Sequence, residues 1–217
     1  MLKTLTSLLL FLTAFAAFAA AQTTDKKTEP ESKTPPKKTN ARPPAKAEPK
    51  EPFEKAPVEK MREQCVKFDT EKGSIEMELY PESAPESVRN FLNLVALGAF
   101  DTTTFSRVVP GFIVQGGNIG TRAEMKPELF ARAAKTVPDE PSQIRHERGI
   151  LSMARADEPN SASSHFFILV DEAKHLDGKF AAFGKVTAGM EVVDAINKMP
   201  VEGDQPTKPV RLNKATV

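Results

Sequence analysis

Two short runs of alternating apolar and polar residues near residue 65 predict a β-hairpin. The apolar positions of the runs are Val66, Phe68, Ile75, Met77 and Leu79. Successive side chains of a strand point to opposite faces, so each run presents one apolar face to a core. The segment DTEKG separates the runs, and we place Gly73 in the loop between them.

The apolar period changes to that of a helix after residue 80. In PESAPESVRNFLNLVALGAF the apolar stripe consists of Val88, Phe91, Leu92 and Val95. Spacings of three and four residues predict an amphipathic helix. Ser83 and Glu86 have the spacing of a capping box, Pro85 suits the first turn, and Gly98 suits the end of the helix.

The remaining apolar runs are short and predict further strands. They are TFSRVV, GFIVQGG, GILSMAR, SHFFILV, FAAFGKV and VRLNKATV, with Pro110-Gly111 between the first two. A second helix is predicted in GMEVVDAINKM, and residues 118–148 predict a loop with one short helical turn near KPELFARA. Many short strands with two good helices favour a mainly β domain built on a closed antiparallel sheet.

The first 57 residues differ in character from the rest. MLKTLTSLLLFLTAFAAFAAAQ has a lysine, an uncharged apolar run and a small-residue end, which predicts a signal peptide over residues 1–21. A retained membrane anchor is the alternative, because the apolar run approaches the roughly 20 residues that span a bilayer. Residues 22–57 hold eight of the 18 prolines among Lys, Glu and Thr, which predicts a disordered linker. The folded domain is expected over residues 58–217.

Charge and residue counts exclude several classes of protein. The formal net charge of +1 and the interspersed lysines and glutamates do not favour a nucleic-acid partner. Cys65 is the only cysteine, so no internal disulfide is possible, and we interpret it as a buried small residue in the first strand. The three histidines have no metal-ligand spacing, so we expect neither a metal nor another cofactor.

Three longer motifs identify a family by resemblance. FSRVVPGFIVQGG, GILSMARADEPNSASSHFFI and LDGKFAAFGKV, in this order and spacing, resemble the cyclophilin-type peptidyl-prolyl cis-trans isomerases from about Val66 to the C-terminus. The resemblance implies an eight-stranded antiparallel β-barrel capped by two α-helices. It also implies an isomerase that acts on X-Pro bonds of exported or unfolded polypeptides and assists their folding.

The same resemblance implies the site residues. Arg107 matches the family's catalytic arginine, and Gln115 matches the glutamine that orients the site. The residues expected to bind substrate are Phe112, Ile113, Ala154, Arg155, His165, Phe167, His175, Leu176 and Phe180. Four of them depart from the usual residue: Arg155 replaces Asn, His165 replaces Gln, His175 stands where Trp accompanies tight cyclosporin binding, and Phe180 replaces His.

The chemistry of isomerisation suits these residue types. Resonance opposes rotation of a peptide bond with a barrier of roughly 18–20 kcal/mol. A twisted amide loses that resonance, and its nitrogen becomes a basic acceptor. A charged donor such as Arg107 that engages the nitrogen only in the twisted state lowers the barrier selectively, while apolar side chains hold the proline ring.

Other interpretations of the same residues stay open at this point. Arg107 could be a structural ion-pair partner, and Phe112, Ile113 and Phe167 could be barrel core. RHERG and HLDGK contain acid and base residues, but no serine elbow accompanies them. The alternative function is a proline-directed peptide-binding or holdase module with incidental turnover. We expect a monomer that is exported across the inner membrane, most simply to the periplasm of a two-membrane bacterium, with the linker as a tether.

Overall fold

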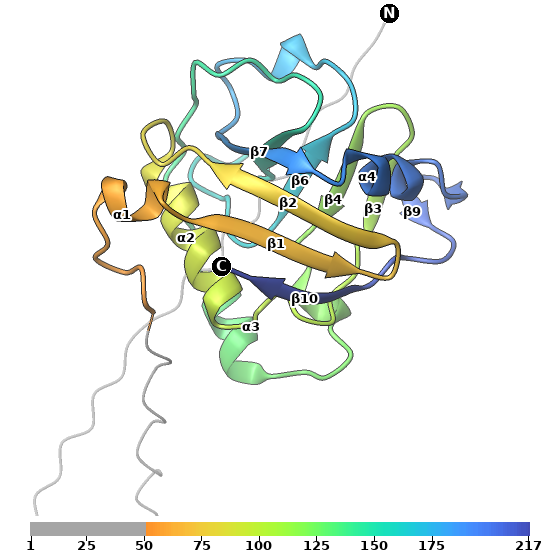
Figure 1. Cartoon of the computed structure of the whole chain (residues 1–217), viewed down its shortest axis with the longest axis horizontal. Helices are drawn as coiled ribbons and strands as arrows, with labels where there is room; N and C mark the ends of the chain where they lie inside the picture. Colours follow the sequence, from red (N-terminus) through yellow and green to blue (C-terminus); the bar gives the residue numbers. More distant parts are fainter. Residues whose placement is uncertain (1–50) are drawn as a thin grey trace, which may run out of the picture. The chain divides into compact units, whose positions relative to one another are not determined.

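The structure of this protein is a computed structural model that describes residues 51–217 (Figure 1). The predicted signal peptide and residues 22–50 of the predicted linker lie outside the described residues. Within 51–217, none of the helices combines the length and the apolar character that crossing a membrane requires.

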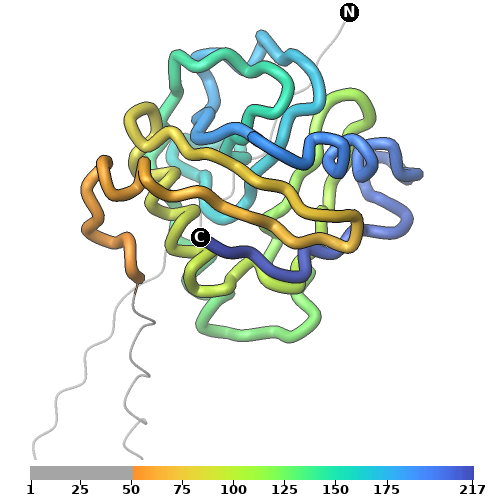
Figure 2. The backbone as a smooth tube through the Cα atoms, in the orientation of Figure 1, coloured from red at the N-terminus to blue at the C-terminus, as the bar shows by residue number. Residues whose placement is uncertain are grey.

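An eight-stranded antiparallel sheet forms the centre of the domain, as the sequence predicts. Its neighbours run in the order β10-β1-β2-β7-β5-β6-β4-β3. The bounds are β1 Cys65–Thr70, β2 Gly73–Leu79, β3 Arg107–Val109, β4 Ile113–Gly116, β5 Ile150–Met153, β6 Phe166–Leu169, β7 Ala182–Ala188 and β10 Leu212–Thr216. The tube trace in Figure 2 follows this sheet as it curls around the core.

The two edges of the curled sheet meet just before β3 and β10. Thr104 and Arg211 form an isolated antiparallel bridge. Beside it, the Phe105 amide donates to the Val210 carbonyl at 3.0 Å, and the Leu212 amide donates to the Thr103 carbonyl at 2.8 Å. The barrel is therefore joined through this short contact and not through a continuous ladder between β3 and β10.

The first hairpin has the predicted strands but a shorter turn. Gly73 pairs with Thr70 as the first residue of β2, so it is not in the loop. Its φ of +130° is one that residues with a side chain rarely adopt, and a Cβ there would come within 2.9 Å of Val192 Cγ2. Cys65 starts β1 and is exposed, so our interpretation of it as a buried residue is wrong. The alternation places Val66, its neighbour, in the core instead.

Helices close the two ends of the barrel. The predicted helices are α2 Pro85–Ala96, which packs against β7 and β10, and α4 Met190–Asn197, which packs against β2, β3 and β4 (Figure 1). The short turn in KPELFARA is α3 Pro127–Ala133. The sequence analysis missed five small elements: α1 Val58–Arg62, the 3-10 turns Ile119–Thr121 and Lys174–Leu176, and the paired strands β8 Val201–Glu202 and β9 Gln205–Pro206.

Five phenylalanine rings fill the barrel at the α2 end. The ring of Phe91, on α2, lies 5.0 Å from that of Phe183 and 5.4 Å from that of Phe166, both centroid to centroid and both edge-on. Phe68 and Phe100 complete the group. All five side chains are fully buried, so the apolar stripe of α2 seals one end of the barrel.

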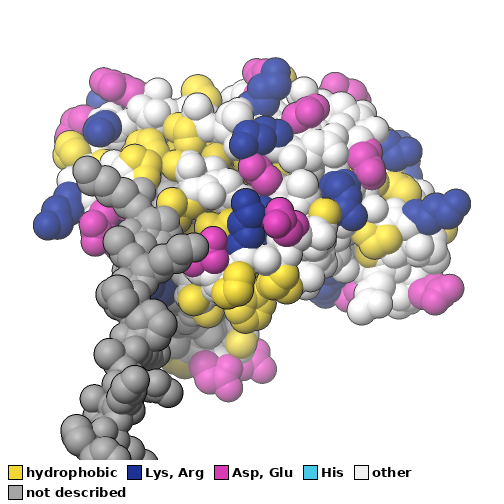
Figure 3. All heavy atoms as spheres, turned by 90° about the horizontal axis from the view of Figure 1, so that it is seen from below, with side chains coloured by type: hydrophobic (Ala, Val, Ile, Leu, Met, Phe, Trp, Pro, Cys, Tyr) yellow, Lys and Arg dark blue, Asp and Glu magenta, His cyan; other side chains and the backbone are white. Residues whose placement is uncertain are grey.

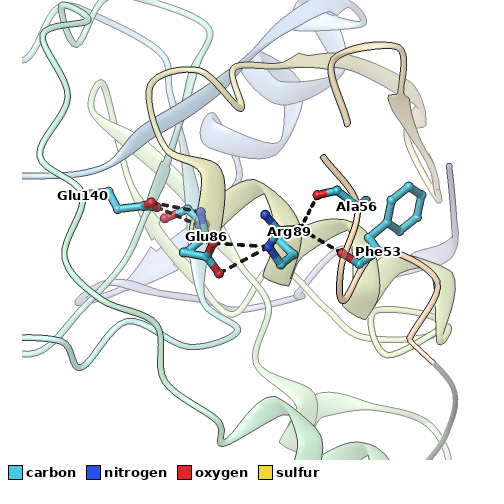
Figure 4. A network of polar contacts seen from close by, with 6 residues as sticks. Phe53, Ala56, Glu86, Arg89 and Glu140 are labelled. Atoms are coloured by element: carbon cyan, nitrogen blue, oxygen red, sulfur yellow. Dashed lines mark hydrogen bonds and ion pairs between the residues drawn. The ribbon is translucent and has the colours of Figure 1, made fainter. Parts of the chain in front are cut away.

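The N-terminus of α2 is capped by a distant residue, so the predicted capping box is wrong. Ala84 is the N-cap residue, and no side chain of the helix caps it. Instead, the Glu140 carboxylate accepts hydrogen bonds from the Glu86 amide at 2.9 Å and the Ser87 amide at 2.8 Å (Figure 4). A carboxylate at this end also interacts favourably with the helix dipole. Glu86 pairs with Arg89.

The ordered domain begins before residue 58. Phe53 is buried against the core, and Asn93 Oδ1 accepts a hydrogen bond from the Phe53 amide at 2.8 Å. Arg89 Nη1 donates to the carbonyls of Phe53 and Ala56 at 3.1 and 2.6 Å (Figure 4). Glu51 pairs with Arg132 of α3. Residues 51–57, which we call the N-terminal strap, therefore belong to the domain, and the predicted linker boundary at residue 57 lies too far along the chain.

Charged side chains of both signs are intermixed on the face of the domain drawn in Figure 3. The face seen in Figure 3 shows Lys and Arg beside Asp and Glu, with apolar side chains between them. This distribution agrees with the interspersed charges of the sequence.

Candidate active site

Strand register places three predicted site residues in one row across the sheet. Arg107 of β3 lies opposite Gln115 of β4, and Gln115 lies opposite Phe167 of β6. Their chain neighbours Val108 and Val114 belong to the barrel core. Because side chains alternate along a strand, the row faces outward from the barrel. Ile113, two residues before Gln115, lies on that same outer side.

A cleft of about 170 Å³ opens over this row. All but two of the predicted site residues line it: Arg107, Phe112, Ile113, Gln115, Ala154, Arg155, Phe167, Leu176 and Phe180. The residues come from β3, β4 and the turn between them, from β6, from the loop after β5, and from the 3-10 turn and loop before β7. The fold thus gathers segments that are far apart in the sequence.

The floor of the cleft is a second apolar cluster, separate from the barrel core. Its buried members are Ile113, Ile150, Phe167, Leu169, Ala173, Leu176 and Ala182. Phe112 and Phe180 are partly buried and pack against it. The ring of Phe180 meets that of Phe167 edge-on, with centroids 6.1 Å apart. This floor can take up a small apolar ring and exclude water from it.

Arg107 is the charged group beside the apolar floor. Its side chain is 44% exposed, so a ligand in the cleft can reach it. Nη1 donates to Gln115 Oε1 at 3.3 Å. On its other edge, Nε and Nη2 donate to Asp204 Oδ2 at 3.0 and 2.8 Å. The guanidinium is therefore held between two acceptors from different parts of the chain.

Asp204 is a site residue that the sequence analysis missed. It lies between β8 and β9, and 97 positions separate it from Arg107 in the sequence. The only local signal is the turn sequence EGDQP, in which Gly203 has a φ of +61°. Such a turn predicts a hairpin but does not indicate which residue the aspartate will contact.

A second guanidinium stands at another side of the cleft. The Cζ atom of Arg155 lies 5.1 Å from the ring centroid of Phe180, within the range of a cation–π contact. Arg155 Nε lies 3.9 Å from the Asp139 carboxylate, and Nη1 donates to the Ala156 carbonyl at 2.9 Å. Ala154, the preceding residue, donates its amide to the His165 carbonyl. Two of the departures from the family pattern, Arg155 and Phe180, thus contact each other.

Two predicted site residues, His165 and His175, adjoin the cleft without lining it. His165 contributes its carbonyl to the bond with Ala154, and burial lowers the pKa of its imidazole. His175 packs its ring against Phe112, with centroids 5.6 Å apart.

A chain of aspartate, histidine and serine adjoins two residues of the cleft, because Asp177 follows Leu176 and Ser152 pairs with Phe167. His146 Nδ1 is 3.1 Å from Asp177 Oδ1, and His146 Nε2 is 2.9 Å from Ser152 Oγ. The order resembles that of a hydrolase triad, but Ser152 is fully buried and its hydroxyl donates to the Ala181 carbonyl. A buried hydroxyl with this partner cannot attack a substrate. Burial lowers the pKa of His146, which outweighs the opposite influence of Asp177.

The cleft suits catalysis without bond cleavage. Its lining residues include neither a carboxylate nor a hydroxyl or thiol that could act as base or nucleophile. Within residues 51–217, His, Cys, Asp and Glu form no group of three that could hold a metal ion. What the lining offers is two charged donors, Arg107 and Arg155, a polar side chain that orients Arg107, and apolar walls.

Comparison with known proteins gives a consistent result. The family model for cyclophilin type peptidyl-prolyl cis-trans isomerases matches residues 65–217. A peptidyl-prolyl cis-trans isomerase of Arabidopsis thaliana is 42% identical over 137 residues, which cover 62% of this chain and 61% of that protein. Peptidyl-prolyl cis-trans isomerase A of Dickeya dadantii is 40% identical over 162 residues, which cover 70% of this chain and 83% of that protein.

A solved structure shares the fold. The crystal structure of a Cryptosporidium parvum cyclophilin type peptidyl-prolyl cis-trans isomerase, determined in the presence of the dipeptide Ala-Pro, has a TM-score of 0.62 and 30% sequence identity. The match covers 71% of this chain and 98% of the Cryptosporidium chain.

Proposed function

Because this chain belongs to the cyclophilin-type peptidyl-prolyl cis-trans isomerase family, we propose that it isomerises X-Pro bonds in exported or unfolded polypeptides and assists their folding. The observation that carries the proposal is the position of Arg107, which is hydrogen-bonded to Gln115 beside the apolar cleft. Uncatalysed X-Pro bonds exchange over about 10–100 s at 25 °C, slowly enough to limit folding.

The proline ring of the substrate occupies the apolar cleft in this proposal. Phe112, Ile113, Phe167, Leu176 and Phe180 supply walls of the right character for a small saturated ring. The Cryptosporidium relative was crystallised in the presence of Ala-Pro, which supports a proline-containing ligand for this cleft as well. With the ring held, rotation takes place in the chain that precedes the proline.

Arg107 lowers the barrier by binding the rotated amide more tightly than the planar one. When the C–N bond twists, its lone pair localises on the prolyl nitrogen, and a guanidinium N–H can donate to it. In the planar amide the same lone pair is delocalised, so the interaction is specific to the transition state. Each roughly 1.4 kcal/mol of such stabilisation raises the rate about tenfold.

Gln115 fixes the guanidinium for this task. Its Oε1 accepts from Arg107 Nη1, and the two residues face each other across the ladder of β3 and β4. A donor that is already oriented needs no reorganisation as the amide twists. The site therefore works by positioning and electrostatics alone, and no step in it requires a cofactor.

We place this activity outside the inner membrane, in the periplasm of a two-membrane bacterium. The sequence of residues 1–21 supports this proposal because it has the charge, apolar run and small-residue end of a signal peptide. We further propose that the protein works as a monomer, because one chain supplies every residue that lines the cleft.

A protease-coupled or exchange assay on a proline peptide tests the function. We expect Arg107→Ala to lose most of the wild-type kcat/KM while keeping its thermal unfolding midpoint. Arg148→Ala is a matched control, because Arg148 also forms an exposed ion pair, with Asp194, but does not line the cleft. The control should retain wild-type activity.

Two outcomes would contradict the proposal in different ways. Wild-type activity in Arg107→Ala would exclude the arginine mechanism. Loss of turnover with undiminished peptide binding and undiminished protection of an unfolded client from aggregation would favour the alternative, a proline-directed holdase in which turnover is incidental.

A further inference from the structure

Asp204 is connected to the arginine-bearing strand at two points. Its backbone carbonyl accepts a hydrogen bond from the Val108 amide at 2.8 Å. Its carboxylate accepts from Arg107 Nε at 3.0 Å and from Nη2 at 2.8 Å. The hairpin of β8 and β9 is thus held against β3 by the residue whose side chain holds the guanidinium.

The Arg107 guanidinium keeps two of its N–H groups for a substrate. A guanidinium carries five N–H groups in a rigid plane. Asp204 accepts from two of them and Gln115 from one. One N–H on Nη1 and one on Nη2 stay available. The donors that could meet a prolyl nitrogen are therefore determined by which edge of the guanidinium Asp204 occupies.

We propose that Asp204 is a positioning residue for isomerisation, an inference that rests on the proposed function of Arg107. Asp204 engages the Nε edge and Gln115 engages Nη1, so the guanidinium plane is held from two sides. With Gln115 alone, the group could turn about the bond from Cδ to Nε. The carboxylate removes that freedom and holds the remaining N–H groups, one on Nη1 and one on Nη2, in a fixed plane.

This role affects kcat more than KM. The apolar floor that holds the proline ring contains no atom of Asp204, so ground-state binding does not depend on it. Orientation of the donor matters chiefly once the amide is twisted. Both side chains are about half exposed, which limits the strength of the ion pair in water.

Kinetics of four variants test the proposal. Asp204→Ala removes the carboxylate, and Asp204→Asn keeps its size and one acceptor oxygen without the charge. We expect kcat to fall about fivefold in Asp204→Ala, as for the loss of an exposed ion pair, with KM within about twofold of wild type. The kcat of Asp204→Asn should lie between that of Asp204→Ala and that of wild type. Glu202→Gln, in the same hairpin but outside the cleft, removes a like charge and should keep wild-type kcat. Arg107→Ala gives the baseline.

A spectroscopic measurement separates positioning from a general loss of structure. The Arg107 Nε–H signal, assigned by its absence in Arg107→Lys, should exchange slowly with water in the wild type. We expect faster exchange in Asp204→Ala and an unchanged signal in Glu202→Gln. Thermal unfolding of each variant shows whether the hairpin still folds.

The double variant Arg107→Ala/Asp204→Ala completes the test. It should be no slower than Arg107→Ala, because Asp204 acts only through the arginine. A further loss would overturn the inference, and so would wild-type or increased kcat in Asp204→Ala while Arg107→Ala is inactive. If Arg107→Ala is inactive while Asp204→Ala keeps or exceeds the wild-type kcat, the proposed function of Arg107 stands and the inference about Asp204 fails. If Arg107→Ala itself is fully active, the proposed arginine mechanism and the inference both fail.

Discussion

Arg107 and Gln115 face each other across the ladder of β3 and β4, and Arg107 Nη1 donates to Gln115 Oε1 at 3.3 Å. The pairing follows from the hairpin itself, because the Pro110-Gly111 turn sets the register of the two strands. The polar residues at these two positions therefore form one unit that faces the cleft.

Substitution of Gln115 should weaken catalysis and leave the fold intact. In Gln115→Ala the guanidinium loses one of its two acceptors, and we expect kcat/KM to fall roughly tenfold, as for a charge-assisted hydrogen bond. Gln115→Glu keeps an acceptor at the same place and should recover part of the activity. Steady-state kinetics at saturating and limiting peptide concentrations measure the activity of both variants. Equal activity of Gln115→Ala and wild type would show that Gln115 does not orient Arg107.

The apolar floor should govern binding of the proline ring. Phe167 is 5% exposed and is a buried member of the second apolar cluster, where it lines the cleft. We expect Phe167→Leu, which keeps most of the volume, to raise KM several-fold and to destabilise the domain by about 1 kcal/mol. Titration of activity with peptide measures the change in KM, and thermal unfolding measures the change in stability. A KM that does not change would mean that the ring binds elsewhere.

The N-terminal strap should stabilise the domain although it lies outside the family match, which begins at residue 65. Phe53 is 6% exposed, and burial of a phenylalanine side chain contributes about 2–3 kcal/mol. We expect Phe53→Ala, or a chain that starts at residue 58, to lower the free energy of unfolding by about that amount.

A matched comparison for the strap is a chain that starts at residue 46, which keeps Glu51 and its pairing with Arg132. It should unfold at the wild-type denaturant midpoint. If the chain that starts at residue 58 also unfolds at the wild-type denaturant midpoint, the contacts of the strap contribute nothing to stability.

Stability should decrease in mild acid because two histidines, the buried His146 and the half-buried His165, have lowered pKa values. Burial lowers the pKa of both His146 and His165 below the ordinary value of 6.5. Between the folded and unfolded pKa values the unfolded chain binds more protons, so stability rises with pH in that range. The contribution is complete above about pH 6.5 and is lost as the pH falls through the lower folded pKa values.

Denaturant unfolding at a series of pH values measures this effect. His165→Gln, which restores the residue usual in the family, should flatten part of the curve. A wild-type free energy of unfolding that stays constant or rises between pH 7 and pH 5 would contradict the assignment.

The sequence predicted those features that depend on local period or on register. Alternation identified the strands, and the same alternation placed Ile113 and Gln115 on one face. The family motifs then singled out residues that the fold gathers around one cleft. Apolar positions on strands could not be separated into barrel core and cleft floor by period alone, since Val114 and Ile113 differ only in which side of the sheet they face.

Contacts over long sequence separations could not be predicted. Glu140 caps α2 from 54 residues away, where a local capping box was expected, because the nearer Ser83 does not occupy the N-cap position. Asp204 reaches Arg107 through a two-stranded hairpin that is too short to give a periodic signal. Phe53 did offer a signal, as the only aromatic residue of the Pro-rich segment, since a lone aromatic residue is a candidate anchor.

The most direct test of the central claim is the on-enzyme exchange rate between cis and trans peptide, measured by NMR at saturating peptide for wild type and Arg107→Ala. If Arg107 stabilises only the rotated amide, the exchange rate falls by at least tenfold, while the dissociation constants of the cis and trans forms stay within about twofold of wild type. An unchanged exchange rate with weakened binding of both forms would show that the arginine holds the ground state, which contradicts the account.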